Sequence, residues 1–194
     1  MYVTIEGNIG AGKTTVLEAI AREFGEQVVV QFEPLDEWEQ GGLLAAMYRG
    51  EISHLEFQLM IMTSLAAQAL QESGRPVIQE RSLAAAFEVF GRVNVTDQTG
   101  FTLLRNTYQS LTALVPVVNK RIYLRAPVKI VAKRRESRSR ASEENITTAY
   151  LQKIHEHHDL WLLQAPNVIV VDASGDVDVV SCEVISIIRE LLSS

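Results

Sequence analysis

Five short runs of apolar and β-branched residues recur along the chain, at residues 2–6, 27–34, 76–80, 119–125 and 167–173. Most of these runs are nearly continuous in their apolar character rather than alternating with polar residues. Strands that are covered on both faces have this pattern, which is typical of a parallel sheet. The pattern therefore predicts five buried strands.

Between these runs, apolar residues recur at helical spacing over residues 14–25, about 53–73, about 82–91, about 98–114 and about 178–193. Strands that alternate with helices predict an α/β fold, with a five-stranded parallel sheet flanked by helices. Ligands in such folds bind beyond the carboxyl ends of the strands.

The composition fits one globular domain over residues 1–194. The net charge of −6 argues against sequence-independent binding of nucleic acid. Cys182 is the only cysteine, so no intrachain disulfide forms, which suits a reducing compartment. No apolar run reaches the roughly 18 residues of a membrane span, and no signal peptide is indicated. We therefore expect a cytoplasmic protein, in the host cytoplasm if the source is viral, without a membrane partner.

A glycine-rich segment, "IEGNIGAGKTT", follows the first predicted strand and precedes the first predicted helix. It fits G-x-x-x-x-G-K-[ST] in the context that a phosphate-binding P-loop requires. Its backbone N–H groups and the helix N-terminus would surround the phosphates of ATP. Lys13 would reach the outer phosphates, and the Thr14 hydroxyl would bind Mg²⁺. The expected ATP-binding residues are Gly7, Asn8, Ile9, Gly10, Ala11, Gly12, Lys13, Thr14 and Thr15.

A P-loop also occurs in regulatory GTPases, but guanine recognition uses an Asn-Lys-x-Asp element. In "NKRI", at residues 119–122, Ile122 stands where the aspartate would be. A nucleotide-binding regulator without catalysis remains an alternative, and a small-molecule kinase is the favoured interpretation.

Basic residues are concentrated in one stretch of this acidic chain, at Lys133, Arg134, Arg135, Arg138 and Arg140. Arg134 and Arg138 are four residues apart, so they share a helix face. Arginines that close over a triphosphate neutralise charge as the phosphoryl group moves. We expect Arg134, Arg138 and Arg140 to act from a short arginine-rich lid at about 134–146.

Carboxylates stand at the ends of two predicted strands, in "FEPLDEW" and "QERS". Glu33 could take a proton from a hydroxyl acceptor, and Glu80 could hold Mg²⁺ directly or through water. From residue chemistry alone, both could equally be carboxylates that cap strand ends.

These motifs, with "LLAAMY", "FQ", R-x-x-x-R-x-R and "YLQKIHEHHDLWL", resemble the deoxyribonucleoside kinase family in order and spacing. The resemblance runs from residue 2 to about 172. It implies a P-loop kinase fold and transfer of the ATP γ-phosphoryl group to a deoxynucleoside, a small-molecule substrate. A nucleoside monophosphate kinase of the same fold, such as a thymidylate kinase, is the alternative. The resemblance also implies a homodimer, with helices around 38–70 and 98–114 at the interface.

The resemblance assigns roles to single residues. Glu33 would be the general base on the 5′-hydroxyl, with Arg81 beside it, and Gln58 would bind the base edge. Tyr48 and a lid glutamate, Glu143 or else Glu144, would hold the 3′-hydroxyl. The base would be lined by Trp38, Phe57, Ile61, Ala86 and Phe90.

The resemblance also bears on base preference. Deoxycytidine- and purine-preferring relatives carry an arginine and an aspartate beside the base, where Leu65 and Ala86 stand here. Their absence predicts thymidine as the best or near-best substrate. His155, His157 and His158 look like a metal cluster, but we expect structural or solvent-facing roles for them.

Overall fold

Five parallel strands form the centre of the computed structural model, which describes residues 1–138 and 146–193. Their order in the sheet is β2-β3-β1-β4-β5, so the first strand of the chain lies in the middle. This confirms the predicted five-stranded parallel sheet. The strands are β1 (Tyr2–Gly7), β2 (Val29–Gln31), β3 (Val77–Glu80), β4 (Lys120–Arg125) and β5 (Val168–Asp172).

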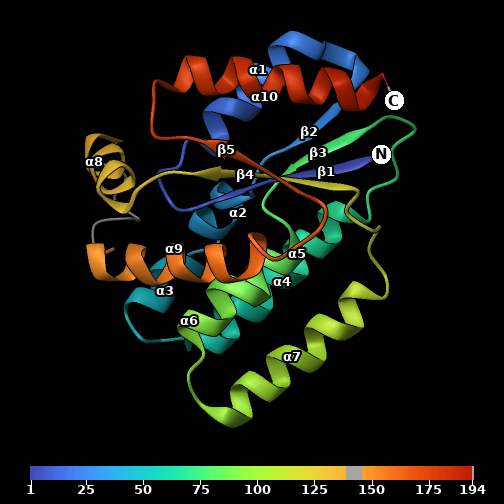
Figure 1. Ribbon diagram of the computed structural model, residues 1–194. Coiled ribbons are helices and arrows are strands. Elements are labelled where there is room, and N and C mark those ends of the chain that lie inside the picture. Colours follow the sequence, from blue (N-terminus) through green and yellow to red (C-terminus); the bar gives the residue numbers. More distant parts are fainter. Residues whose placement is uncertain (139–145, 194) are drawn as a thin grey trace.

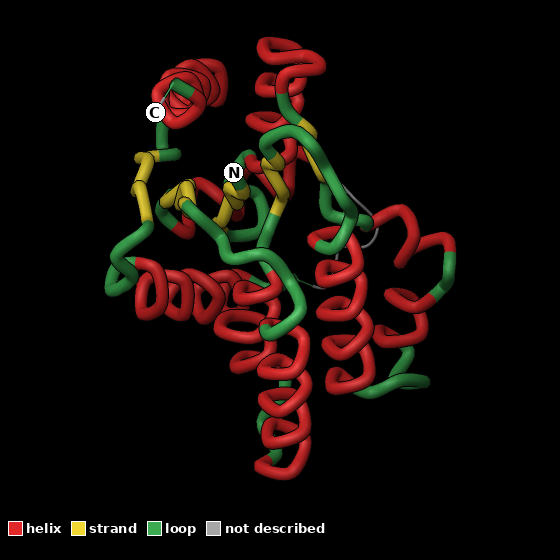
Figure 2. Tube along the Cα trace, turned by 90° about the vertical axis from the view of Figure 1, so that its right-hand side faces the viewer, coloured by secondary structure: helices red, strands yellow, loops and turns green. Residues whose placement is uncertain are grey.

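Helices cover both faces of this sheet. Figure 1 shows α1 and α10 on one face and α4, α5, α7 and α9 on the other. The side view in Figure 2 shows the same layering, with the strands between two groups of helices. The helices are α1 (Lys13–Phe24), α2 (Leu35–Gln40), α3 (Leu43–Tyr48), α4 (His54–Ala69), α5 (Leu83–Ala85), α6 (Arg92–Asn94), α7 (Gln98–Thr112), α8 (Val128–Arg138), α9 (Thr148–Leu162) and α10 (Val177–Leu192), with a 3₁₀ turn η1 (Gly25–Gln27) and a π-helix η2 (Ala86–Gly91).

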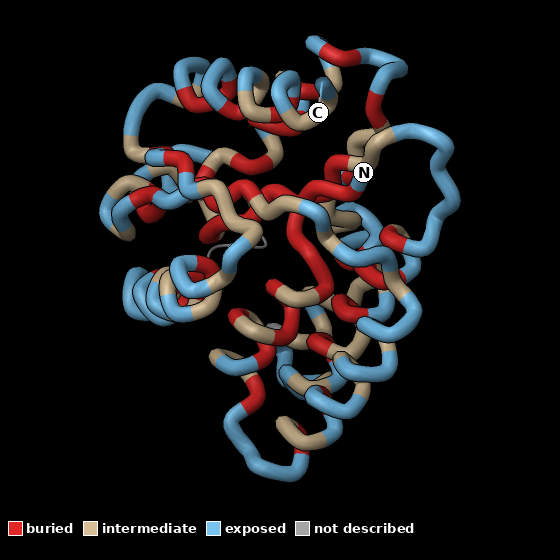
Figure 3. Tube along the Cα trace, turned by 45° about the vertical axis from the view of Figure 1, so that its right-hand side comes forward, coloured by how far each residue is buried: buried red, intermediate tan, exposed pale blue. Residues whose placement is uncertain are grey.

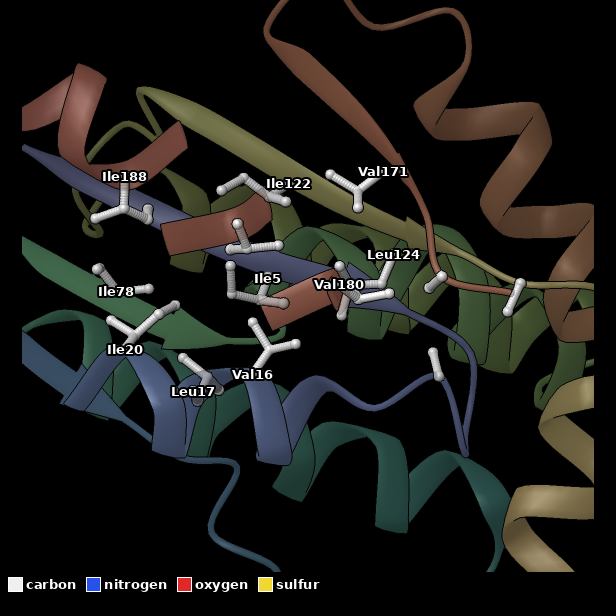
Figure 4. Close-up of a cluster of buried hydrophobic side chains, with 14 of the residues drawn as sticks. Ile5, Val16, Leu17, Ile20, Ile78, Ile122, Leu124, Val171, Val180 and Ile188 are labelled. Atoms are coloured by element: carbon white, nitrogen blue, oxygen red, sulfur yellow. The ribbon is translucent and has the colours of Figure 1, made fainter. Parts of the chain in front are cut away.

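The first hydrophobic core lies between the sheet and the α1/α10 pair. Figure 4 shows Ile5 and Ile122 from neighbouring strands against Val16 and Ile20 of α1 and Ile188 of α10. Strand residues alternate between faces, so Val3 and Ile5 point into this core while Tyr2, Thr4 and Glu6 point to the other side. All five are buried, and the segment that follows the amino terminus is coloured as buried in Figure 3.

A second core, on the opposite side of the sheet, joins α2, α4, α5, η2 and α7. It contains aromatic side chains from several elements and is continuous with the region beyond the strand ends. Its fully or nearly buried members are Trp38, Phe57, Ile61, Met62, Leu65, Ala66, Leu83, Ala86, Phe87, Val95 and Leu104.

The second strand is shorter than the run at 27–34 predicts. Its ladder to β3 ends where Gln31 lies opposite Gln79. Beyond that point Pro34 has no N–H to donate, and Leu35 N–H donates to the carbonyl of Glu33 in a tight turn (2.8 Å). Glu33 therefore lies in a loop at the carboxyl edge of the sheet rather than within a strand.

Candidate active site

The glycine-rich segment joins β1 to α1 and is folded tightly against its neighbours. A Cβ on Gly10 would lie 2.6 Å from the carbonyl oxygen of Val131, and one on Gly7 would lie 2.8 Å from that of Leu124. Both glycines have positive φ, at 82° and 151°. The loop thus needs glycine at these positions for both space and backbone conformation.

Asn8 ties this loop to the rest of the molecule. Its Nδ2 donates to the carbonyl of Leu151 on α9 (2.9 Å), and its Oδ1 accepts from Ile9 N–H (2.8 Å). Lys13 Nζ in turn donates to the Asn8 carbonyl (3.2 Å). The lysine side chain is therefore folded back along the loop, as a phosphate-binding lysine requires.

Thr14 and Glu80 form the second feature of the loop. The Thr14 hydroxyl donates to Glu80 Oε1 (3.1 Å), and Lys13 Nζ lies 3.9 Å from the same oxygen. Burial raises the pKa of Glu80, and burial followed by the nearby Arg81 charge lowers the pKa of Lys13 to about 8. A hydroxyl and a carboxylate this close supply the oxygen ligands that Mg²⁺ prefers. The residues present therefore fit both a triphosphate and Mg²⁺.

Glu33 and Arg81 meet across the ends of β2 and β3. Arg81 Nε donates to Glu33 Oε1 (2.8 Å), with both side chains almost buried. The Arg81 guanidinium also lies over the ring of Phe90, 4.2 Å from its centre. Its Nη1 is buried without a hydrogen-bond partner among the described residues. At this place, the Glu33 carboxylate is paired with an arginine that has one buried N–H donor without a partner among the described residues.

A cavity of about 430 Å³ joins these groups. Its lining combines the P-loop, the two carboxylates and the aromatic residues of the second core. It contains most of the predicted site residues: Ile9, Gly10, Gly12, Lys13, Thr14, Thr15, Glu33, Trp38, Phe57, Gln58, Ile61, Glu80, Arg81, Phe90 and Arg138.

Aromatic side chains and one amide form the apolar end of the cavity. Trp38 and Phe57 pack edge to face, with ring centres 6.4 Å apart, and Trp38 Nε1 donates to Ser64 Oγ (3.3 Å). Gln58 is 1% exposed, and its Oε1 has no hydrogen-bond partner among the described residues. A buried amide with an unused acceptor is suited to binding a polar edge of a flat molecule.

Not every predicted residue lines the cavity. Three residues belong to the glycine-rich loop without lining the cavity: Gly7, Asn8 and Ala11. Arg134 donates through Nη1 to the Ala173 carbonyl (2.7 Å) and through Nη2 to that of Gly175, between β5 and α10. Arg138 does line the cavity, from the end of α8. Arg140, Glu143, Glu144 and the side chain of Tyr48 lie outside the described residues.

Leu65 and Ala86 are fully buried in the second core rather than in the cavity wall. They belong to the same buried cluster as Ile61 and Phe57, which do line it. Any effect of Leu65 or Ala86 on a bound base would therefore act through the packing of this cluster.

Four lining residues lie outside the motifs quoted from the sequence: His54, Asn94, Ile146 and Thr147. Tyr150 is hydrogen-bonded to Asn94, and burial raises the pKa of its hydroxyl. Their elements, α4, α6 and α9, are far apart in sequence and converge only in the folded chain. A further signal was available for Tyr150, which opens the motif "YLQKIHEHHDLWL".

Two of the three clustered histidines of α9, His155 and His158, have different surroundings. His158 is fully buried, stacks on Tyr123 with ring centres 5.7 Å apart, and contacts the Ile154 carbonyl through Nδ1 (2.8 Å). His155 instead faces Asp159 (3.5 Å). Within residues 1–138 and 146–193, no group of three or more histidine, cysteine, aspartate or glutamate side chains is arranged to hold a metal ion. No helix in the same residues is long and apolar enough to span a membrane.

Comparison with known proteins bears directly on this site. The family model described as deoxynucleoside kinase matches residues 3–193. The chain is 32% identical over 197 residues to a thymidine kinase of Ictalurid herpesvirus 1, covering 95% of this chain and 84% of that protein. It is 27% identical to a probable deoxycytidine kinase of Fowlpox virus, covering 91% of this chain and 79% of that one.

The fold has a solved counterpart as well. A deoxyadenosine kinase from M. mycoides, solved with the products dCMP and a flexible dCDP, superposes with a TM-score of 0.84. The match covers 98% of this chain and 100% of that one, at 23% identity. The sequence match over nearly the whole length, the P-loop and the carboxylate-lined cavity agree, and the chain belongs to the deoxynucleoside kinase family, as an ATP-dependent phosphotransferase.

Proposed function

We propose that this kinase transfers the γ-phosphoryl group of ATP to the 5′-hydroxyl of a pyrimidine deoxynucleoside, with thymidine favoured. The observation that carries the proposal is the single cavity that holds a phosphate loop at one end and the Gln58 amide at the other. Between these ends lies the Glu33–Arg81 pair. A nucleoside with its base at Gln58 would direct its sugar toward that pair.

Glu33 acts in this proposal as the general base. Its carboxylate lines the cavity and lies at hydrogen-bonding distance from Arg81 only through Oε1. The other oxygen is therefore available to accept the proton of a 5′-hydroxyl. Arg81 holds the carboxylate in place.

The phosphoryl donor, ATP, is assigned to the P-loop, and Mg²⁺ is assigned to the side-chain oxygens of Thr14 and Glu80. Bound ATP supplies the phosphoryl group, and bound Mg²⁺ neutralises charge on its phosphates. Lys13 and Thr14 orient the phosphates, Glu80 and Thr14 hold the metal, and Arg138 reaches the cavity from the end of α8. Arg134 and Arg140 stay predicted members of the same lid, with Glu143 and Tyr48 predicted at the 3′-hydroxyl.

Base binding is assigned to the apolar end. Gln58 would exchange hydrogen bonds with the base edge, while Trp38, Phe57 and Phe90 contact its faces and rim. A pyrimidine offers both a donor and an acceptor on that edge, which matches the two functional atoms of an amide.

The preference for thymidine follows from what lies behind the wall. Leu65 and Ala86 are apolar and fully buried, so neither of these two positions places a charged group beside a 5-methyl group. The similarity to a viral thymidine kinase supports the same choice. A methyl contact is worth only about 1–3 kcal/mol, so discrimination among pyrimidines should be graded. Ile61 also lines the cavity and narrows the space for any base, thymine included.

One assay tests this proposal. The enzyme is incubated with radiolabelled ATP, Mg²⁺ and each of thymidine, deoxyuridine, deoxycytidine, deoxyadenosine, deoxyguanosine and thymidine monophosphate, and kcat/KM is ranked. We expect thymidine first, deoxyuridine and deoxycytidine next, and purines last. Deoxyadenosine or deoxyguanosine ahead of thymidine would contradict the base preference, and phosphorylation of the monophosphate alone would indicate a nucleoside monophosphate kinase.

A homodimer is the assembly that we propose. Large apolar side chains on and after α7 are exposed in the single chain, among them Leu103 and Leu114. The α7 helix packs on α4, so the two helices present a continuous outer surface.

A further inference from the structure

Arg81 has an unusual backbone conformation for its residue type. Its φ is 60°, and it is the one non-glycine residue with positive φ in the described part of the chain. A long side chain in the left-handed region is strained, because its Cβ crowds the following carbonyl. Such a conformation persists only where the surroundings hold it.

The surroundings of Arg81 hold it from both sides. Its N–H donates to the Ile5 carbonyl (3.0 Å), and its own carbonyl accepts from Gln79 Nε2 (3.0 Å). The next residue is fixed as well, since Ser82 N–H donates to Glu6 Oε1 (3.2 Å). Residues of both β1 and β3 therefore hold the backbone of Arg81 in this conformation.

Gln79 is held in turn by Tyr2 at the start of β1. The Tyr2 hydroxyl donates to Gln79 Oε1 (2.7 Å), and the Gln79 side chain is fully buried. A carbonyl can only accept, so the amide must present its NH₂ group to Arg81 and its oxygen to Tyr2. Burial raises the pKa of Tyr2, which keeps its hydroxyl protonated as the donor. The amide orientation is thus determined.

We propose that Gln79, oriented by Tyr2, is a positioning residue that holds Arg81 in its left-handed conformation and so directs the guanidinium onto Glu33. The proposal rests on the proposed role of Glu33 as the general base. Neither Gln79 nor Tyr2 lines the cavity, so both act only through Arg81. Without this support the Arg81 backbone would relax, and its side chain would leave both Glu33 and the Phe90 ring.

Gln79→Met tests this directly, because methionine keeps the length and bulk of the side chain without its polar atoms. We expect kcat to fall roughly 10- to 100-fold, the scale of a misplaced catalytic group, with KM for ATP unchanged. Among the described residues, the Gln79 amide forms hydrogen bonds with Tyr2 and Arg81 and with no residue of the P-loop, so ATP binding should not respond. A wild-type kcat in a folded Gln79→Met enzyme would overturn the proposal.

Tyr2→Phe is the second variant and removes one hydroxyl at the far end of the chain of hydrogen bonds. It should lower kcat in the same direction, by less than Gln79→Met. Thr4→Val is the matched control, because Thr4 lies on the same strand and the same face and its buried hydroxyl has no partner among the described residues. Thr4→Val should keep wild-type kcat, and an equal loss in Thr4→Val and Tyr2→Phe would indicate a general effect of disturbing β1, contrary to the proposal.

A crystal structure and a double variant separate this proposal from the role of Glu33. In Gln79→Met, we expect Arg81 to leave the left-handed region and its Nε to move away from Glu33; an unchanged Arg81 would overturn the proposal whatever the activity. In a Glu33→Gln background, Gln79→Met should cost little further kcat. If Glu33→Gln alone has wild-type turnover, the general base is wrong, while the conformation of Arg81 still decides the role of Gln79.

Discussion

Glu33 enters the cavity with one carboxylate oxygen already engaged by Arg81. Such an arrangement fixes the direction of the second oxygen at no cost during catalysis, because the orientation is set before the substrate arrives. Arg81 also offsets the repulsion between Glu33 and the buried Glu80. The Glu33 charge raises the pKa of Glu80, and the Arg81 charge lowers it.

Glu33→Gln tests the base while preserving the shape of the side chain. Glutamine cannot take up the hydroxyl proton, so we expect kcat to fall roughly 10²- to 10⁴-fold. KM for the nucleoside should change much less. The control is Glu37→Gln, an exposed position on α2 that does not line the cavity. Wild-type turnover in Glu33→Gln would remove Glu33 from the mechanism.

His158 predicts a dependence of stability on pH. Burial, with a smaller effect of the Arg81 charge, lowers its pKa from 6.5 to about 3. Below pH 6.5 the unfolded chain therefore takes up a proton that the folded chain does not, and the folded state loses stability as the pH falls toward 3. The loss amounts to at most about 1.4 kcal/mol per pH unit.

His158→Phe should remove this dependence while keeping an aromatic ring against Tyr123. The free energy of unfolding, measured by denaturant titration between pH 6 and pH 4, should fall less steeply in the variant than in the wild type. Parallel curves for the two proteins would mean that His158 is protonated in the folded state.

At the scale of the elements, the catalytic cavity is built by the ends of strands and helices rather than by their middles. The segments that follow β1, β2 and β3 bring Lys13, Glu33 and Arg81 together, because the carboxyl ends of parallel strands meet at one edge. The α4 helix begins with a capping box, in which Ser53 and Glu56 satisfy each other's backbone N–H groups. That fixed start places Phe57 and Gln58 in the first turns of the helix.

Arg138, in the last described turn of α8, is the residue at which the proposed role of the lid arginines can be tested. Arg138→Ala should lower kcat/KM by removing a positive charge from the transferring phosphoryl group. The melting temperature should barely change, because the side chain is exposed. Arg105→Ala, also exposed but on α7, is the control for loss of one arginine. A large drop in melting temperature with normal kinetics would assign Arg138 a structural role.

Elements could be predicted from the sequence where they depend on residues that are close together along the chain. The five strands and the P-loop follow from apolar runs and from glycines within a few residues of one another. The π-helix η2 does not, because its surroundings are made by α5, α7 and α9; a Cβ on Gly91 would lie 2.6 Å from the Leu104 side chain. Likewise, Asn94 and Tyr150 reach the cavity from separate helices, and no spacing along the chain connects them.

The dependence on distant parts of the chain also explains why the hydrogen-bond partners of Arg134 could not be predicted from the sequence. Its spacing from Arg138 correctly indicates one helix, α8, but the helix turns its face so that Arg134 is engaged by two carbonyls near β5. Which way a helix faces depends on its packing partners, and these come from distant parts of the sequence.

For the whole molecule, the testable property is assembly. A chain of 21.6 kDa that dimerises should sediment with about twice that mass. Leu103→Asp, on the exposed face of α7, should shift the population toward monomer, because a charge would be buried at an apolar interface. Val179→Asp is the matched control on α10, on the other side of the sheet. A monomeric wild-type protein, or equal effects of both substitutions, would contradict this interface.

The central place of β1 has a consequence for how the chain acquires its fold. β1 pairs with β3 through Val3 and Ile78 and with β4 through Val3 and Lys120. The β1 strand thus finds its partners 75 and 117 positions further along the chain, counted from Val3 to Ile78 and to Lys120. Contacts of such long sequence separation close large loops and form slowly. The apolar strand β1 and the phosphate loop after it therefore gain their sheet partners late in folding, and the nucleotide site is complete only when these distant segments have joined.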